Sequence, residues 1–232
     1  MSRVLLPLAV LEGETVSLGL LRLLGTVDVT VLGYYVPPDQ TSAAQARNQF
    51  GERARSTLDD VIQEFQQAGG DAEYRLVFTH DRQQTIRRVA EDIDARAIVT
   101  TGATGNVDRL LVSLSGDVDV EGILSFVREL IGDRRIAVTL LATGRNTDTV
   151  QLRLDEAESR LSAAGIDVTT QRKTGAAFTA IVDTVSGHDA VVIGEDGPSL
   201  SSLVFGDEPA RIAATTVSPV LVVRSNRVTN NT

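Results

Sequence analysis

Short apolar runs rich in valine, isoleucine and leucine recur along the chain, and turn residues bound each of them. Nearly continuous apolar runs are typical of strands in a parallel sheet that is covered on both faces. The pattern predicts strands at residues 4–6, 27–36, 73–78, 97–101, 110–114, 136–142, 168–171, 190–193 and 220–223.

Segments with helical periodicity separate these runs. Residues 49–68 carry an apolar side chain at every third or fourth position with charged residues between, and residues 152–164 show the same pattern. Glycines follow both segments, at Gly69-Gly70 and at Gly165, and glycine commonly ends a helix. Strands that alternate with helices predict an α/β fold.

The chain contains two copies of one pattern. Arg3-Val-Leu-Leu-Pro-Leu is similar to Arg109-Leu-Leu-Val-Ser-Leu, and each precedes a helical stretch and a valine-rich strand. A polar loop at 37–47 has no counterpart in the second copy. We therefore predict two consecutive open parallel-sheet α/β domains with a boundary near Asn106. The domains span residues 1–106 and 107–225, and a flexible tail follows at 226–232.

The two copies end differently. After Gly194 the second copy has a loop, a predicted helix at about 208–215 and a last strand, whereas only residues 103–108 follow Gly102 before the next strand. A parallel crossover needs a dozen or more residues. The first domain is therefore expected to lack its last helix and strand. Alternatively, residues 110–114 pair antiparallel with the edge of the first sheet.

Composition narrows the class of protein. The 232 residues include 31 acidic and 22 basic side chains, which gives a net charge of −9 and disfavours nucleic acid as a partner. Lysine occurs once, at Lys173, which fits either a coding bias toward arginine or a halophile-like, salt-rich cytoplasm. The absence of cysteine excludes disulfides and thiolate chemistry. No apolar run is long enough for a membrane span and no signal-peptide layout is present, so we expect a cytoplasmic protein without direct membrane insertion.

The most informative segment follows the strand that ends at Ile193. Gly194 and Gly197 are three residues apart, and Gly206 comes just before a predicted helix. Ligands of open parallel sheets bind beyond the carboxyl ends of the strands. Glycines at these positions let backbone N–H groups approach a phosphate. The spacing therefore predicts a phosphate-binding loop.

Gly194-x2-Gly197-x8-Gly206-Asp207, with the later Ser-Pro-Val-Leu-Val-Val-Arg, resembles the last βαβ unit of the universal stress protein family. The family has nine residues before the third glycine and a serine or threonine after it. The strand at 109–114 and its Ser115-Gly116-Asp117 loop are similar to the family's opening strand and Asp-Gly-Ser loop. The resemblance covers most of residues 107–225 and, more weakly, residues 1–105.

The resemblance implies an adenine-nucleotide site, with ATP and Mg²⁺ as possible ligands. The residues that match the motif form a degenerate site made of Ser115, Gly116, Asp117, Ile193, Gly194, Gly197, Gly206 and Asp207. ATP-binding members have an aspartate where this chain has Ser115 in the second copy and Ala9 in the first. The first copy keeps Gly102-x2-Gly105 but has no third glycine before a helix of its own, so no nucleotide site is predicted there.

Asp207 weakens the predicted site, because it replaces the hydroxyl that touches phosphate in the family. A carboxylate about 4 Å from a phosphate oxygen repels it by about 4 kcal/mol at an effective dielectric constant near 20. The lost hydroxyl donor removes about 0.5–1.5 kcal/mol more, although a bridging Mg²⁺ would reverse the repulsion. Asp207 also fits an N-cap of the following helix, which is the interpretation we favour.

The two histidines offer little chemistry. His80 follows a predicted strand and precedes Asp81, which we expect to cap a helix over 82–93, with Gln84 completing a capping box. His80 could act as a ligand or base, but no second histidine and no serine–acid pair accompanies it in the sequence, so we favour a solvent-facing loop position. His188 precedes a strand and is expected to be structural. No nucleophile elbow, Walker A loop or metal-spaced cluster is present in the sequence, so no catalytic residue and no metal ligand is predicted.

Three functions follow from these observations. The first is a non-catalytic regulatory or binding protein in the stress response, with lost or weak ATP binding. The second is an ATP-binding switch or slow ATPase that uses the 194–207 loop. The third is a cytosolic sensor domain that partners a membrane transporter. The expected assembly is a homodimer or an internal pseudo-dimer, in which residues 220–223 also offer an edge to another chain, and the protein partner is unknown.

Overall fold

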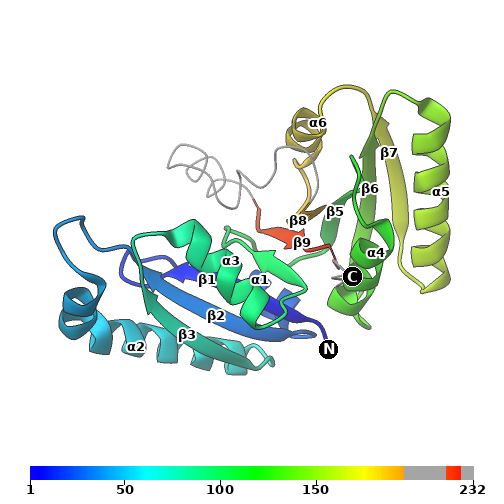
Figure 1. Cartoon of the computed structure of the whole chain (residues 1–232). Coiled ribbons are helices and arrows are strands. Elements are labelled where there is room, and N and C mark those ends of the chain that lie inside the picture. The colour runs from blue at the N-terminus through cyan, green and yellow to red at the C-terminus, as the bar shows by residue number, and fades with distance from the viewer. Residues whose placement is uncertain (196–217, 226–232) are drawn as a thin grey trace, which may run out of the picture.

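The computed structural model describes residues 1–195 and 218–225. They form nine strands and six helices in the order β1 (Arg3–Ala9), α1 (Leu18–Leu24), β2 (Asp28–Tyr35), α2 (Ala43–Gln67), β3 (Ala72–Phe78), α3 (Arg82–Asp92), β4 (Ala97–Val99), β5 (Arg109–Ser113), α4 (Val120–Ile131), β6 (Ala137–Thr143), α5 (Thr147–Ala163), β7 (Val168–Lys173), α6 (Ala177–Thr184), β8 (Ala190–Gly194) and β9 (Val220–Val223) (Figure 1). The predicted α/β class is confirmed, and each predicted strand is present.

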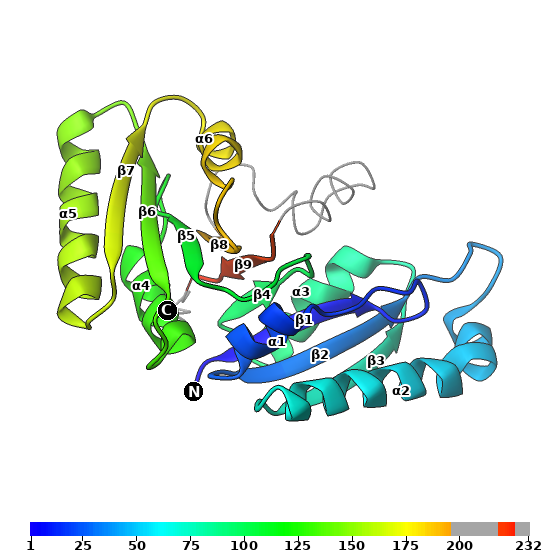
Figure 2. The ribbon, with the colours of Figure 1, turned by 180° about the vertical axis from the view of Figure 1, so that it is seen from behind.

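All described strands belong to one sheet with the order β3-β2-β1-β4-β9-β8-β5-β6-β7. Every neighbouring pair is parallel except β4 and β9, which are antiparallel and pair Ile98 with Val222. We call residues 1–106 the first half and residues 107–225 the second half. Figures 1 and 2 show strands β1–β4 in one lobe and β5–β8 in the other, with β9 between them.

The single sheet corrects two expectations. We expected two separate sheets, but β9 fills the place beside β4 where the first half has no fifth strand, and so joins them. Both edges of β9 are therefore occupied within the chain, and residues 220–223 have no edge to offer to another chain. The alternative pairing of residues 110–114 is wrong, because β5 lies parallel between β6 and β8.

Two apolar layers cover the sheet, one on each face. The larger layer contains side chains of α1, α2, α4 and α5 and of strands from both halves, and the smaller contains side chains of α3 and α6. Successive residues of a strand point to opposite faces, so Leu6 belongs to the larger layer and Leu5 to the smaller. A fully buried leucine contributes about 1.5–3 kcal/mol. Because the larger layer crosses the boundary, the halves share one core.

Helix α2 begins earlier than predicted. Part of the expected polar loop at 37–47 is its first turn, because Ser42 and Gln45 form a capping box. The Ser42 hydroxyl accepts from the Gln45 backbone N–H at 3.2 Å, and the Gln45 side chain accepts from the Ser42 N–H at 3.0 Å. This serine-x-x-glutamine signal is visible in the sequence and was missed.

The predicted cap of α3 is confirmed in part. The Asp81 carboxylate accepts from the Gln84 backbone N–H at 2.9 Å. The Asp81 N–H donates to the hydroxyl of Thr79 at 3.1 Å and so takes a partner other than the expected Gln84 side chain. The predicted helix at 208–215 and the tail at 226–232 lie outside the described residues. Of the helices that the structure describes, none is long and apolar enough to cross a membrane.

Candidate functional site

The antiparallel contact between β4 and β9 places the carboxyl ends of the strands of the two halves at opposite ends of the sheet. Ala97, at the start of β4, pairs with Val223, at the end of β9. The carboxyl ends of the second-half strands therefore lie at the same end of the sheet as the amino ends of β1, β2 and β4. The carboxyl ends of the first-half strands lie at the opposite end of the sheet.

The predicted second-half site contains two neighbouring strand ends. Ser115, Gly116 and Asp117 follow β5, while Ile193 and Gly194 end β8, which pairs with β5. The structure therefore brings these five predicted residues to one place. The other three predicted residues, Gly197, Gly206 and Asp207, lie outside the described residues.

Ser115 is turned into the protein. Its side chain is buried, and its hydroxyl oxygen accepts a hydrogen bond from the backbone N–H of Thr143 at 3.1 Å. The bond ties the loop after β5 to the end of β6. The hydroxyl oxygen of Ser115 therefore already accepts a hydrogen bond from the backbone of its own chain.

Arg153 of α5 also bonds to this loop, and the sequence did not point to it. Its Nη1 donates to the carbonyl oxygens of Leu114 and Gly116, each at 2.8 Å. Gly116 has a φ of +87°, which favours glycine, and this conformation turns the chain toward α4. No carboxylate of the described residues lies at ion-pair distance from Arg153. An arginine on the polar side of a helix gives no sequence signal of this role.

Gly194 is needed because Val118 packs directly against it. A Cβ atom at Gly194 would lie 2.8 Å from Cγ1 of Val118, closer than real Cβ contacts. The next residue, Glu195, lies 3.8 Å from Nε of Arg224 as a partly exposed ion pair. Val118 of the chain itself therefore fills the space beside Gly194.

Arg96 of the first half brings a positive charge close to the loop after β5. Nη2 of Arg96 lies 4.0 Å from a carboxylate oxygen of Asp119, the residue that caps α4 by accepting from the Gly122 N–H at 2.9 Å. Nη1 of Arg96 is buried and has no hydrogen-bond partner among the described residues. Arg96 therefore links the loop after β5 to the first half.

A glutamate occupies the corresponding strand ends of the first half. Oε2 of Glu14 accepts from the backbone N–H of Ala9 at 2.7 Å, and Oε1 accepts from the hydroxyl of Thr101. Ala9 ends β1, and Thr101 follows β4, which pairs with β1. The carboxylate of the chain itself therefore uses donors at the position where a nucleotide fold would present them to a ligand.

The glycine loop of the first half is covered as well. A Cβ atom on Gly19 of α1 would lie 1.5 Å from the carbonyl oxygen of Gly105, so the helix packs directly on the segment that keeps the Gly102-x2-Gly105 spacing. This close approach accounts for the glycine in α1.

Both histidines bond to backbone carbonyls. Nε2 of His80, which is exposed, lies 3.1 Å from the carbonyl oxygen of Thr41. Nδ1 of His188 lies 3.0 Å from the carbonyl oxygen of Thr184, and its Nε2 lies 2.8 Å from the hydroxyl of Thr139. A carbonyl only accepts, so Nδ1 of His188 carries a proton. The predicted loop position of His80 and structural role of His188 are confirmed.

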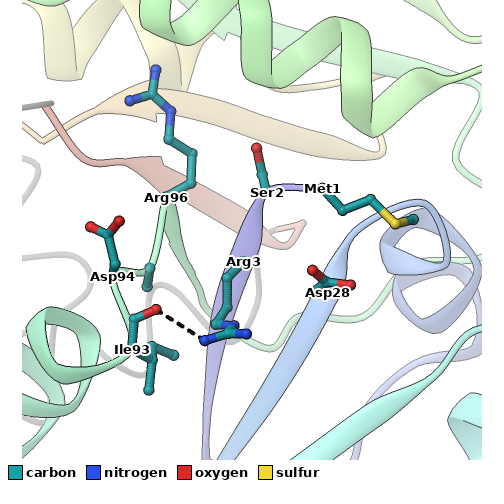
Figure 3. Close-up of a pocket in the computed structure, with 8 residues that line it drawn as sticks. Met1, Ser2, Arg3, Asp28, Ile93, Asp94 and Arg96 are labelled. Atoms are coloured by element: carbon teal, nitrogen blue, oxygen red, sulfur yellow. Dashed lines mark hydrogen bonds between the residues drawn. The ribbon is translucent and has the colours of Figure 1, made fainter.

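A cavity of about 370 Å³ lies at the amino ends of β1, β2 and β4, and Figure 3 shows residues that line it. Arg3 and Arg96 line it, but their guanidinium groups point in opposite directions, and Arg3 donates to the carbonyl oxygen of Ile93 at 3.4 Å (Figure 3). Asp28 and Asp94 lie on either side. The charges do not converge on one point. Within residues 1–195 and 218–225, no three acidic or histidine side chains gather as a metal site.

Comparison with solved structures identifies the fold. A universal stress protein from Archaeoglobus fulgidus DSM 4304 matches with a TM-score of 0.66 and 18% identity over 96% of this chain and 96% of that chain. A functionally unknown protein from Pseudomonas aeruginosa PAO1 matches with a TM-score of 0.54 and 15% identity over 96% of this chain and 92% of that chain. Comparisons with protein-family models and with curated proteins found no match. The chain has the universal stress protein fold.

Proposed function

We propose that this chain is a non-catalytic regulatory or binding protein of the universal stress protein type, with weak or lost ATP binding. One observation carries the proposal: groups of the chain itself occupy the strand ends where such a fold would receive a nucleotide. Glu14 bonds to Ala9 and Thr101 in the first half, and Ser115 bonds to Thr143 in the second. A nucleotide would have to replace these bonds at a cost of about 0.5–1.5 kcal/mol each.

The histidines support the non-catalytic part of the proposal. They are the side chains best suited to general acid–base work near neutral pH. His80 and His188 each have a ring nitrogen at hydrogen-bond distance from a backbone carbonyl, and the second nitrogen of His188 contacts a threonine hydroxyl. Neither residue follows β5 or β8, whose ends form the predicted site.

One observation favours the second candidate, an ATP-binding switch or slow ATPase that uses the 194–207 loop. Arg153 brings a cation to the loop after β5, and its hydrogen bonds to Leu114 and Gly116 use Nη1 alone. A guanidinium with free donors beside a glycine loop would attract a phosphate. In this candidate the arginine offsets part of the repulsion that Asp207 exerts.

Isothermal titration with Mg-ATP separates the two candidates. The proposal predicts no saturable heat for the wild type or for Asp207→Ser. Micromolar binding that strengthens in Asp207→Ser and weakens in Arg153→Ala would support the switch and contradict the proposal. Asp39→Ser is the matched control, since it removes one exposed acidic charge from a loop of the first half.

A further inference from the structure

A cavity lies at the boundary between the two halves, beside the amino ends of β5 and β6. It has a volume of about 270 Å³, and its lining includes Arg22, Asn106, Asp108, Arg134 and Arg135. We call it the junction groove. Arg22 belongs to α1 of the first half, whereas Arg134 and Arg135 follow α4 of the second half.

The charges that line the junction groove are mainly positive. Three arginines and one acidic residue, Asp108, line it. A second cavity of about 500 Å³ shares Asp108, Arg134 and Arg135 with the groove, but it adds Asp133 and Asp167. The excess of positive charge is therefore confined to the smaller cavity, in a chain whose net charge is −9.

Arg134 places a positively charged guanidinium at the junction groove, and no carboxylate of the described residues pairs with it. Its side chain donates to the carbonyl oxygens of Arg22, Leu23, Leu130 and Ile131, and to the hydroxyl of Thr26. No carboxylate of the described residues lies within 4.0 Å of it. Burial lowers the pKa of Arg134, because removal from water penalises the charged form. The ends of α1 and α4 offer only partial negative charge.

The other two arginines are exposed and keep donors for a ligand. Nη1 of Arg22 donates to the side-chain oxygen of Asn106 at 3.1 Å, which holds the guanidinium beside the groove. Arg135 makes no ion pair or side-chain hydrogen bond with the described residues. Guanidinium groups bind phosphate oxygens through paired, charge-assisted hydrogen bonds.

We propose that the junction groove binds a small oxyanion, a phosphate or diphosphate group, between Arg22, Arg134 and Arg135. The anion contacts both halves, so its binding stabilises their association. This site is separate from the strand ends considered under the proposed function, and neither proposal depends on the other.

Thermal unfolding in increasing inorganic phosphate or pyrophosphate tests the site, with sodium chloride at matched ionic strength as reference. A ligand that binds only the folded chain raises the melting temperature as its concentration exceeds the dissociation constant. Phosphate also stabilises proteins generally by exclusion from their surface. The decisive quantity is therefore the difference between the wild type and the Arg22→Ala, Arg135→Ala double variant.

The proposal predicts that the double variant loses at least tenfold in phosphate affinity, while Arg128→Ala, which removes an exposed arginine of α4 outside the groove, behaves as the wild type. Line broadening of the phosphorus NMR signal gives the same comparison without unfolding. An equal response of the double variant and the wild type, or no response of the wild type, overturns the proposal. If ATP raises the melting temperature but phosphate and pyrophosphate do not, and if it raises that of the double variant equally, the ligand binds outside the groove. That result also overturns the proposal.

Discussion

Nη2 of Arg134 donates to the backbone carbonyl oxygen of Leu23 at 2.9 Å, across the boundary between the two halves. The last carbonyls of a helix have no partner within the helix, and this bond satisfies one of them in α1. Arg224 acts in the same way on the other face, where Nη1 donates to the carbonyl oxygens of Ala90 and Ala95, each at 3.1 Å. Two second-half arginines therefore cap helix ends of the first half.

Replacement of Arg134 should destabilise the chain. Arg134→Ala removes five side-chain hydrogen bonds and leaves the carbonyl of Leu23 in α1 without a donor, whereas the carbonyls of Arg22, Leu130 and Ile131 each keep a second donor. We expect the free energy of unfolding to fall by about 2–4 kcal/mol, at about 1 kcal/mol per lost bond with some replaced by water. Urea denaturation measures the change. Arg135→Ala is the control and should stay within about 0.5 kcal/mol of the wild type, because its side chain is exposed.

The two halves should unfold together. All three tyrosines, Tyr34, Tyr35 and Tyr74, lie in the first half, and the chain has no tryptophan, so tyrosine fluorescence reports that half alone. Far-ultraviolet circular dichroism reports both halves. Because the sheet and the larger apolar layer are continuous, the two transitions should coincide. Separate midpoints would show that the halves fold independently.

A charge in β9 should disturb the distant tyrosines. Val222 is buried and pairs with Ile98 of the first half and Ile193 of the second. Val222→Asp places an unpaired carboxylate in the core, which costs several kcal/mol. The tyrosine transition should therefore move to lower urea concentration. Gln171→Asp, at an exposed position of the outer strand β7, should leave it in place.

Two helical glycines should respond in opposite directions to alanine. Gly19→Ala forces the carbonyl of Gly105 away from α1, since the new Cβ would lie 1.5 Å from its oxygen, and we expect a loss of about 2–4 kcal/mol. Gly51→Ala in α2 meets only ordinary contacts at 3.8 Å and should gain about 0.5–1 kcal/mol from helix propensity. Denaturation of both variants measures the pair. A neutral Gly19→Ala would contradict the close packing of α1 on the Gly105 loop.

Removal of Glu14 should cost stability without creating a nucleotide site. Glu14→Ala leaves the N–H of Ala9 without its acceptor and frees the Thr101 hydroxyl, so we expect a loss of about 1–3 kcal/mol. Glu14→Gln keeps one acceptor oxygen and should lose less. Titration of Glu14→Ala with Mg-ATP should show no binding, because α1 still covers the first-half glycine loop. Binding in this variant would instead show that Glu14 alone blocks the site.

The elements that were predicted well depend on neighbouring residues in the chain. The apolar runs locate the strands, and Asp81 locates the start of α3, because strand and helix patterns are read within a few residues. Ser42 and Gln45 carried an equally local signal that was missed. Ser115 and Gly194 lie at the carboxyl ends of β5 and β8, and their proximity could be predicted because these two strands are parallel neighbours. Arg153 and Glu14 were not found, because their partners lie in other elements.

The amino-acid sequence by itself determined the α/β class, the alternation of strands and helices, and the repeated pattern, since these follow from local periodicity and turn chemistry. Only the tertiary structure decided that β9 joins the two sheets, that Val118 packs against Gly194 and Glu14 bonds to the strand ends of the first half, and that arginines cap helices across the boundary. Each of these contacts joins segments that lie in different elements, so no local pattern in the sequence specifies it. Which contacts form depends on the strand edges, helix faces and unpaired carbonyls that remain available when the whole chain packs.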